Sequence, residues 1–266
     1  MTVFLEQAAA SGLCGEFFFI RYSDPEPHLR LRLRTPTAAD AETMLAEFCT
    51  FGRSLMGSEW CSRFAVDTYE REIERYGGPE VISAAEALFV ADSALVVELF
   101  RLLKRTDLAR EMLAAITAAD LLDGFGLSEP SLIELKSRLR SIRQEAGAAY
   151  RKLKKSPLVE EPDLLAREPE GGDVLCCLDR RRAAAGAVGS LLHRLDAERR
   201  LTAPPVEICH SFLHMHCNRL LGRDRAEERK VLGLMFRVRE ARQARHEATQ
   251  NQIVLQSRKD NLHPVA

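Results

Sequence analysis

The run His28-Leu29-Arg30-Leu31-Arg32-Leu33-Arg34 alternates strictly between basic and leucine side chains. Successive side chains of an extended strand point to opposite faces, so one face would carry three leucines and the other His28, Arg30, Arg32 and Arg34. The leucine face can pack against a core. The basic face suits a carboxylate, a phosphate or a developing oxyanion, because each guanidinium stays charged and offers forked hydrogen-bond donors.

An ordinary antiparallel strand with its polar face in water is the alternative to such a site. Neighbouring cations at consecutive outward positions repel each other, however, and gain nothing in plain solvent. The run alone therefore leaves both an anion site and a solvated strand open.

The first third of the chain predicts strands and turns. Residues 17–22 form an apolar run, and residues 23–27 contain two prolines that cannot extend a strand, so residues 17–34 predict a hairpin with a five-residue connection. Thr37 can cap a helix that continues to about Arg53. Residues 64–69 predict a further strand.

The remainder predicts helices, because apolar residues recur at helical spacing. The expected helices cover residues 80–104, 107–122, 131–155 (opened by a capping box at Ser131), 174–200, 206–221 and 224–246 (capped by Asp224). The fold class is therefore α+β, with a small N-terminal antiparallel sheet packed against a predominantly helical remainder. We expect a single domain over residues 1–246 with an exposed connector at about 156–173, and a polar, flexible tail over 247–266.

Composition excludes several classes of protein. The chain of 266 residues has a net charge of -1, so nothing global draws it to nucleic acid or to a membrane. It has no apolar run long enough to span a bilayer and no secretory signal. Seven cysteines without a CxxC pair argue against a disulfide framework or a zinc ribbon and favour reduced thiols in a cytoplasmic location. No glycine-rich phosphate loop is present, and we expect no cofactor and no metal.

Three further segments carry polar residues of interest. The charges of residues 69–76 alternate in sign, which is typical of a solvated face laced by salt bridges, and Gly77-Gly78-Pro79 would force a sharp turn after Arg75 and Tyr76. Asp92 and Ser93 interrupt an apolar helix, which usually means a surface or packing position.

The third segment is the histidine-rich stretch 210–219. On a helix His210, His214 and Asn218 share one face, whereas His216 lies well round the helix. A zincin would need glutamate where Ser211 stands, so buried or hydrogen-bonded histidines are favoured over a metal site.

Together these segments resemble a known family. Residues 17–32, 67–79, 86–93 and 212–222 are similar to four ordered motifs of the C-terminal domain of class I lantibiotic dehydratases, also called the thiopeptide-type bacteriocin biosynthesis domain. The resemblance extends from about residue 15 to 240. Four ordered motifs at sensible spacing make it specific.

The resemblance implies a lyase. In the full-length family a large N-terminal domain transfers glutamate from glutamyl-tRNA to Ser or Thr of a precursor peptide. The C-terminal domain then eliminates glutamate and leaves dehydroalanine or dehydrobutyrine. This chain has no room for the glutamylating domain. The resemblance therefore implies a free-standing elimination half that acts on a precursor peptide beside a separate glutamyl-tRNA-dependent glutamylating protein, with no direct nucleic-acid or membrane partner and with a homodimer left open.

The resemblance also implies site residues. Arg30, Arg32, Glu72, Arg75 and His214 match catalytic positions, and His28, Arg34, Tyr76 and Asn218 are expected to bind substrate. As a hypothesis, the arginines hold the glutamyl carboxylates and stabilise the enolate, His214 delivers a proton to the leaving group, and Glu72 either orients an arginine or acts as the base. This hypothesis requires Arg32, Arg75 and His214 to meet around one anion-binding pocket.

Two other functions stay open on the same scaffold. A pyridine synthase of thiopeptide pathways joins two dehydroalanines by a formal aza-[4+2] cycloaddition, but that branch has largely lost the arginine, glutamate and histidine set present here. A non-catalytic scaffold would bind the precursor peptide or tRNA without turnover. A plain arginine-rich RNA-binding module is disfavoured by the near-zero net charge.

Overall fold

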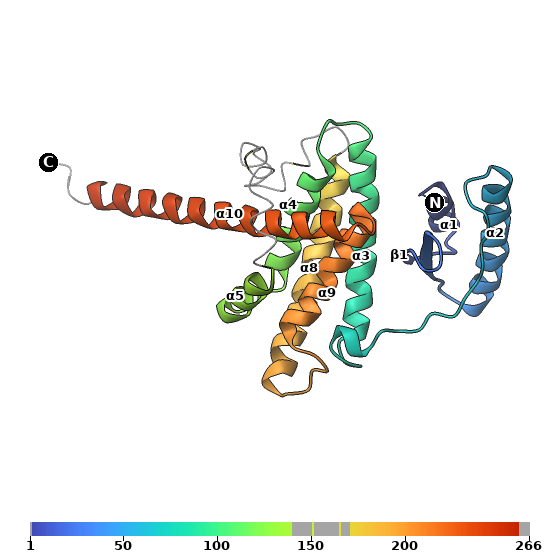
Figure 1. Cartoon of the computed structure of the whole chain (residues 1–266), viewed down its shortest axis with the longest axis horizontal. Coiled ribbons are helices and arrows are strands. Elements are labelled where there is room, and N and C mark those ends of the chain that lie inside the picture. The colour runs from blue at the N-terminus through green and yellow to red at the C-terminus, as the bar shows by residue number, and fades with distance from the viewer. Residues whose placement is uncertain (1, 140–150, 152–164, 166–170, 261–266) are drawn as a thin grey trace.

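The computed structural model describes residues 2–139, 151, 165 and 171–260. Along the chain it contains α1 (Thr2–Ala10), β1 (Glu16–Tyr22), β2 (His28–Arg34), α2 (Ala38–Gly57), the 3₁₀ helix η1 (Glu74–Tyr76), α3 (Ile82–Leu103), α4 (Arg110–Gly124), α5 (Glu129–Arg138), α8 (Gly171–Ala197), α9 (Pro205–Leu221) and α10 (Arg225–Asp260). Helices α3, α4, α5, α8 and α9 pack into a helical body, and α10 crosses it and extends beyond it (Figure 1). The predicted α+β class is confirmed.

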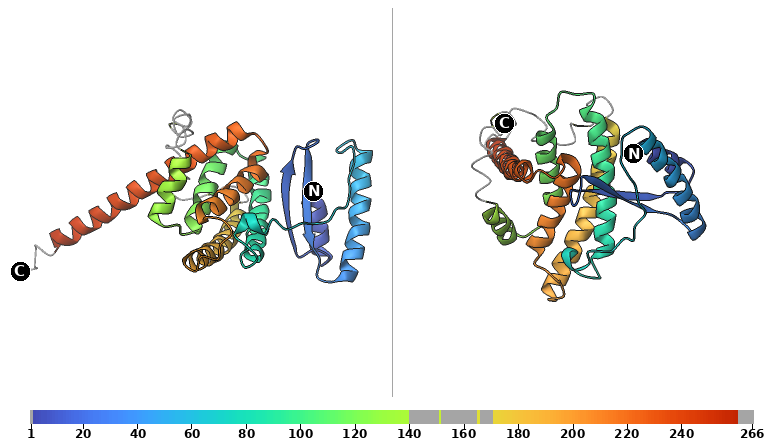
Figure 2. Two further views of the ribbon diagram at one scale, coloured as in Figure 1. Left: turned by 60° about the horizontal axis from the view of Figure 1, so that its bottom comes forward. Right: turned by 45° about the vertical axis from the view of Figure 1, so that its right-hand side comes forward.

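The hairpin forms as predicted. Strand β1 pairs with β2 in antiparallel register from Glu16 opposite Arg34 to Tyr22 opposite His28. The hairpin lies between the helical body and α2 (Figures 1 and 2). Its leucine face packs as expected, because Leu31 and Leu33 lie against a small apolar cluster contributed by α1 and α2. We call the opposite face, which bears His28, Arg30, Arg32 and Arg34, the cationic face.

Helix α3 is the central element of the main core. Its apolar residues pack against α8, α9 and β1. Phe19 of β1 is buried in the same core, so the hairpin is attached to the helical body through β1. None of the helices in the described ranges combines the length and hydropathy that crossing a bilayer requires.

Two of the predicted helix caps are correct and one is wrong. The Thr37 side chain accepts a hydrogen bond from the Asp40 amide at the start of α2, and the Asp224 carboxylate accepts from the first amides of α10. Helix α5 is capped by Ser128 and not by Ser131, whose amide donates to the Ser128 hydroxyl. The Pro130 ring fits the first turn of this helix, which explains the earlier start.

The segment 64–69 is not the predicted strand. No regular secondary structure is assigned to residues 63–72, which run from α2 to η1. Two aromatic residues of the segment pack separately instead: the Phe64 ring lies against Gly52 of α2 and the Tyr69 ring against Phe18 of β1.

The chain ends also differ from the prediction. Helix α1 was not predicted, and α10 continues to Asp260 where an end near residue 246 was expected. The first 14 residues of the predicted flexible tail are therefore helical, because residues 234–260 contain no glycine or proline that would stop the helix. Most of the predicted connector 156–173, and residues 140–155 of the preceding helix except Arg151, lie outside the described residues.

Candidate active site on the cationic face of the hairpin

Two aromatic residues of β1 lie beside basic residues of β2 on the cationic face. Directly opposed residues of paired strands share a face, which places Tyr22 beside His28 and Phe18 beside Arg32. The Arg30 guanidinium lies 3.8 Å from the centre of the Tyr22 ring, and its Nε donates to Nε2 of His28 at 3.2 Å. Nδ1 of His28 in turn donates to the Glu26 carbonyl at 2.8 Å, so these contacts fit a neutral imidazole with its proton on Nδ1.

Arg30 and Arg32 have no carboxylate partner among the described residues. Arg32 lies 5.2 Å from the centre of the Tyr69 ring and reaches only the Leu31 carbonyl, at 3.4 Å. Its Nε is buried and has no hydrogen-bond partner. Arg34 differs, because it pairs with Glu16 at 3.0 Å. An unpaired buried donor costs free energy, so Arg32 is suited to an anion that comes from outside the chain.

A cavity of about 460 Å³ opens between the cationic face and the beginning of α3. Its walls include Phe18, Arg32, Arg34, Tyr69, Arg71 and Glu86. The buried Glu86 carboxylate accepts from the Tyr69 hydroxyl at 2.9 Å and from two nitrogens of Arg71 at 2.8 Å each. Burial and this hydrogen bond to Glu86 raise the pKa of Tyr69, so its hydroxyl stays a donor. The Arg71–Glu86 pair balances its own charge, and the cavity keeps the positive charge of Arg32.

The Gly-Gly turn orients η1 as the sequence predicted. Gly77 and Gly78 have φ angles of +98° and +108°, in the region that favours glycine. Arg75 pairs with Glu72, with Nη1 3.3 Å from a carboxylate oxygen. Tyr76 is only 1% exposed and packs among aromatic rings of the core, and burial raises its pKa to about 12. Its expected role in substrate binding is therefore not supported by exposure.

His214 belongs to a different group of contacts. Its Nδ1 lies 2.8 Å from a Glu228 oxygen and 3.0 Å from Nη1 of Arg225 at the start of α10. Burial would raise the pKa of Glu228, but His214 and Arg225 outweigh it and lower the pKa. No hydrogen bond or ion pair in the described part of the chain joins His214 to Arg32 or Arg75. The single pocket that the hypothesis requires is thus not formed by direct contacts.

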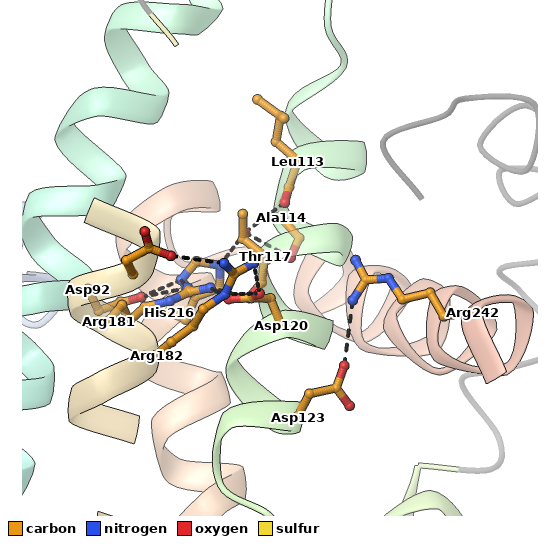
Figure 3. Close-up of polar contacts among 11 residues, drawn as sticks. Asp92, Leu113, Ala114, Thr117, Asp120, Asp123, Arg181, Arg182, His216 and Arg242 are labelled. Carbon is orange, nitrogen blue, oxygen red and sulfur yellow. Dashed lines mark hydrogen bonds and ion pairs between the residues drawn. The ribbon is translucent and has the colours of Figure 1, made fainter. Parts of the chain in front are cut away.

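A buried ionic network was missed by the sequence interpretation. Asp92 of α3 accepts from His216 at 2.7 Å, from Arg219 at 2.8 Å and from Arg181 at 3.2 Å (Figure 3 shows the contacts with His216 and Arg181). Arg181 also donates to Asp120 at 2.9 Å. Burial would raise the pKa of Asp92, but His216, Arg219 and Arg181 lower it well below its usual range.

This network joins α3, α4, α8 and α9. The available signal was a set of charged residues at apolar positions of several predicted helices, of which Asp92 was noted and assigned to surface or packing. A packing position is correct for Asp92 and Ser93, since both are fully buried. His216, set aside because it lies off the face of His214, is buried in the network.

Side chains of the helical body cover the outer edge of β1. The Phe19 amide donates to the Ser93 hydroxyl at 3.2 Å, and Nε of Arg219 donates to the Phe19 carbonyl at 2.8 Å. The Asn218 amide group accepts from the Arg21 amide at 2.8 Å and donates to the Arg21 carbonyl at 2.9 Å. Asn218, expected to bind substrate, therefore uses its polar groups to hold the hairpin in place.

Comparisons with known proteins place the chain in a family. The family described as "Lantibiotic biosynthesis dehydratase C-term" matches residues 1–239. The subtilin biosynthesis protein SpaB of Bacillus subtilis is 30% identical over 82% of this chain and 21% of its own length. The nisin biosynthesis protein NisB of Lactococcus lactis subsp. lactis is 26% identical over 85% of this chain and 22% of its own length. The chain thus spans about a fifth of the length of these curated relatives.

Two crystal structures are similar in fold. The tRNA-dependent lantibiotic dehydratase MibB from Microbispora sp. 107891 matches 93% of this chain and 26% of its own, with a TM-score of 0.74 and 27% identity. The structure of TsrL matches 91% of this chain and 89% of its own, with a TM-score of 0.55 and 14% identity. The second similarity concerns the fold alone.

Proposed function

Since this chain belongs to the lantibiotic dehydratase C-terminal family, we propose that it eliminates glutamate from glutamylated Ser and Thr residues of a ribosomally made precursor peptide. The products would be dehydroalanine and dehydrobutyrine, and the activity that of a lyase. The substrate would come from a preceding step that transfers glutamate from glutamyl-tRNA to the peptide.

One observation carries this proposal: Arg30 and Arg32 lie on one face of β2 without a carboxylate partner in the described residues, and Arg32 keeps a buried unpaired Nε. A glutamyl ester supplies a side-chain carboxylate, and its elimination releases a second one. Charge-assisted hydrogen bonds between guanidinium and carboxylate are about twice as strong as neutral ones.

The reaction needs no redox partner. A base removes the Cα proton of the glutamylated residue, a Cα–Cβ double bond forms, and the Cβ–O bond breaks with its electron pair leaving on glutamate. Negative charge builds up on the peptide carbonyl oxygen as the proton leaves. An arginine placed at this oxygen can accelerate the reaction by ~10²–10³.

The remaining predicted roles are part of this proposal. Glu72 orients Arg75, which the 3.3 Å ion pair between them supports. His214 handles a proton in cooperation with Glu228, its partner at 2.8 Å. Because no hydrogen bond or ion pair among the described residues joins His214 to Arg32 or Arg75, the substrate itself would have to bridge the two groups.

A synthetic peptide that carries an O-glutamyl serine tests the proposal. The wild-type chain should release glutamate and leave dehydroalanine, followed by mass spectrometry and by a glutamate assay. Arg32→Ala should lower the rate by at least ~10², the value of one lost transition-state donor. Arg53→Ala on the exposed side of α2 is the matched control and should react at the wild-type rate.

Two results would contradict the proposal. One is wild-type chain that binds the glutamylated peptide but releases no glutamate, which would favour a binding scaffold. The other is an Arg32→Ala variant as active as the Arg53→Ala control, which would remove the cationic face from the chemistry.

A further inference from the structure

Strand β2 has an outer edge that carries unused backbone groups. In an antiparallel pair, residues alternate between those bonded to the partner strand and those whose N–H and C=O point away. Phe19 and Arg21 of β1 bond to side chains of the helical body, so they point away from β2. Their partners in the register are Leu31 and Leu29, whose backbone groups must therefore point to the opposite, outer edge.

This edge has no strand partner within the described residues. The sheet consists of β1 and β2. The one contact recorded at the outer edge is weak, because it is the 3.4 Å approach of the Arg32 side chain to the Leu31 carbonyl. Leu29 is 45% exposed, which shows that solvent reaches the strand there. The edge of β1, by contrast, is closed by Ser93, Asn218 and Arg219.

We propose that the substrate peptide binds in extended form along the outer edge of β2, as an added third strand. This inference rests on the proposed function for the identity of the occupant. Addition of a strand to a free edge supplies main-chain hydrogen bonds that do not depend on peptide sequence. Such binding would accept a glutamylated residue in different sequence contexts.

The charge of the neighbouring face selects the occupant. Every second residue of an added strand points to the same side as Arg30 and Arg32, with Cβ atoms about 4.5–5.5 Å from the opposed residue of β2. A glutamyl group on such a residue extends over the cationic face, where the guanidinium groups of Arg30 and Arg32 have no carboxylate partner in the described residues. The intervening residues of the added strand would point to the leucine face of the hairpin.

Substitution of Leu31 tests the docking edge. Leu31→Pro removes the outward N–H but none of the hydrogen bonds to β1, a position at which an edge strand tolerates proline. Leu31→Ala shortens the side chain and keeps the N–H, so it is the matched control. We expect kcat/KM for a ten-residue glutamylated peptide to fall about tenfold more in Leu31→Pro than in Leu31→Ala. A minimal substrate, N-acetyl-O-glutamylserine methylamide, should react equally well with both variants.

N-Methylation of the peptide gives a second measurement that needs no protein variant. A series of peptides, each methylated at one backbone nitrogen near the glutamylated serine, should lose reactivity with a period of two residues. Equal reactivity at all positions, or a loss that does not alternate, would overturn the strand-addition model even if both Leu31 variants are poorly folded.

Failure of the docking model is distinguishable from failure of the proposed function. If wild-type chain releases no glutamate from any substrate, the lyase proposal is wrong. The docking edge is then still tested by fluorescence anisotropy of a labelled peptide with a glutamyl amide in place of the ester. Equal affinity of the peptide for Leu31→Pro and Leu31→Ala would refute binding along the outer edge of β2. Binding to Leu31→Pro that is about tenfold weaker would support it.

Discussion

Replacing Asp92 by asparagine should cost about a third of the stability of this fold. The carboxylate accepts from His216, Arg181 and Arg219, all of them buried. In the variant Arg181 keeps Asp120, whereas Arg219 loses the only carboxylate partner it has within the described part of the chain. Removing one partner of a buried ion pair costs about 3–5 kcal/mol, against a total of about 5–15 kcal/mol for a typical domain.

Urea denaturation followed by circular dichroism measures this change. With a slope of about 1–3 kcal/mol per molar urea, the midpoint should fall by at least about 1 M. Asp196→Asn, on the exposed side of α8, is the control and should stay within about 0.5 kcal/mol of the wild type.

The pH dependence gives an independent check. Burial would raise the pKa of Asp92, but the surrounding His216, Arg219 and Arg181 lower it from its usual value of 3.8. A group with a lowered pKa in the folded state contributes stability that is complete above 3.8 and is lost as the pH falls further. The advantage of wild type over Asp92→Asn should therefore shrink as the pH falls below 3.8. A variant within 1 kcal/mol of wild type at pH 7, or an advantage that grows on acidification, would refute the reasoning.

Three further predictions concern the packing around the hairpin. Gly52→Ala would place a Cβ 2.6 Å from the Phe64 ring and should destabilise by about 1–3 kcal/mol in thermal melts, whereas Gly57→Ala has open space and should be neutral or stabilising. Asn218→Ala leaves the Arg21 amide and carbonyl unpaired, so hydrogen exchange of the Arg21 amide should accelerate by at least about tenfold; unchanged exchange would show that β1 is held by other means. Spectrophotometric titration of the four tyrosines should show Tyr69 and Tyr76 ionising above pH 10 in the folded chain, and Tyr69→Phe should remove one of these late steps.

The hairpin and most helices could be predicted because their signals are local. The alternation in residues 28–34 and the two prolines before it specify strand and turn within a few residues, and the apolar stripe of α3 sets its face. The segment 64–69 could not be assigned from a local signal, because a short run of residues does not show whether a partner strand exists. The continuation of α10 beyond residue 246 was predictable, because no glycine or proline interrupts residues 247–260. The polar composition of these residues suggested a flexible tail instead.

Only the part of the candidate site that depends on local strand geometry could be predicted from the sequence. The shared face of Arg30 and Arg32 follows from strand geometry alone. The Asp92 network assembles residues from four helices, and no spacing in the sequence reveals that Arg181 and His216 meet the same carboxylate. The contacts of His214 also depend on helix packing, since α10 supplies its partner Glu228.

The side chains of three residues form hydrogen bonds to backbone atoms of β1: Ser93, Asn218 and Arg219. Every amino acid except proline has the same backbone N–H and C=O groups. A library of variants should therefore accept nearly any residue but proline in place of Arg21, while few replacements of Asn218 survive. Position 21 can therefore vary while these hydrogen bonds still hold β1, because they are made by backbone atoms and not by the Arg21 side chain.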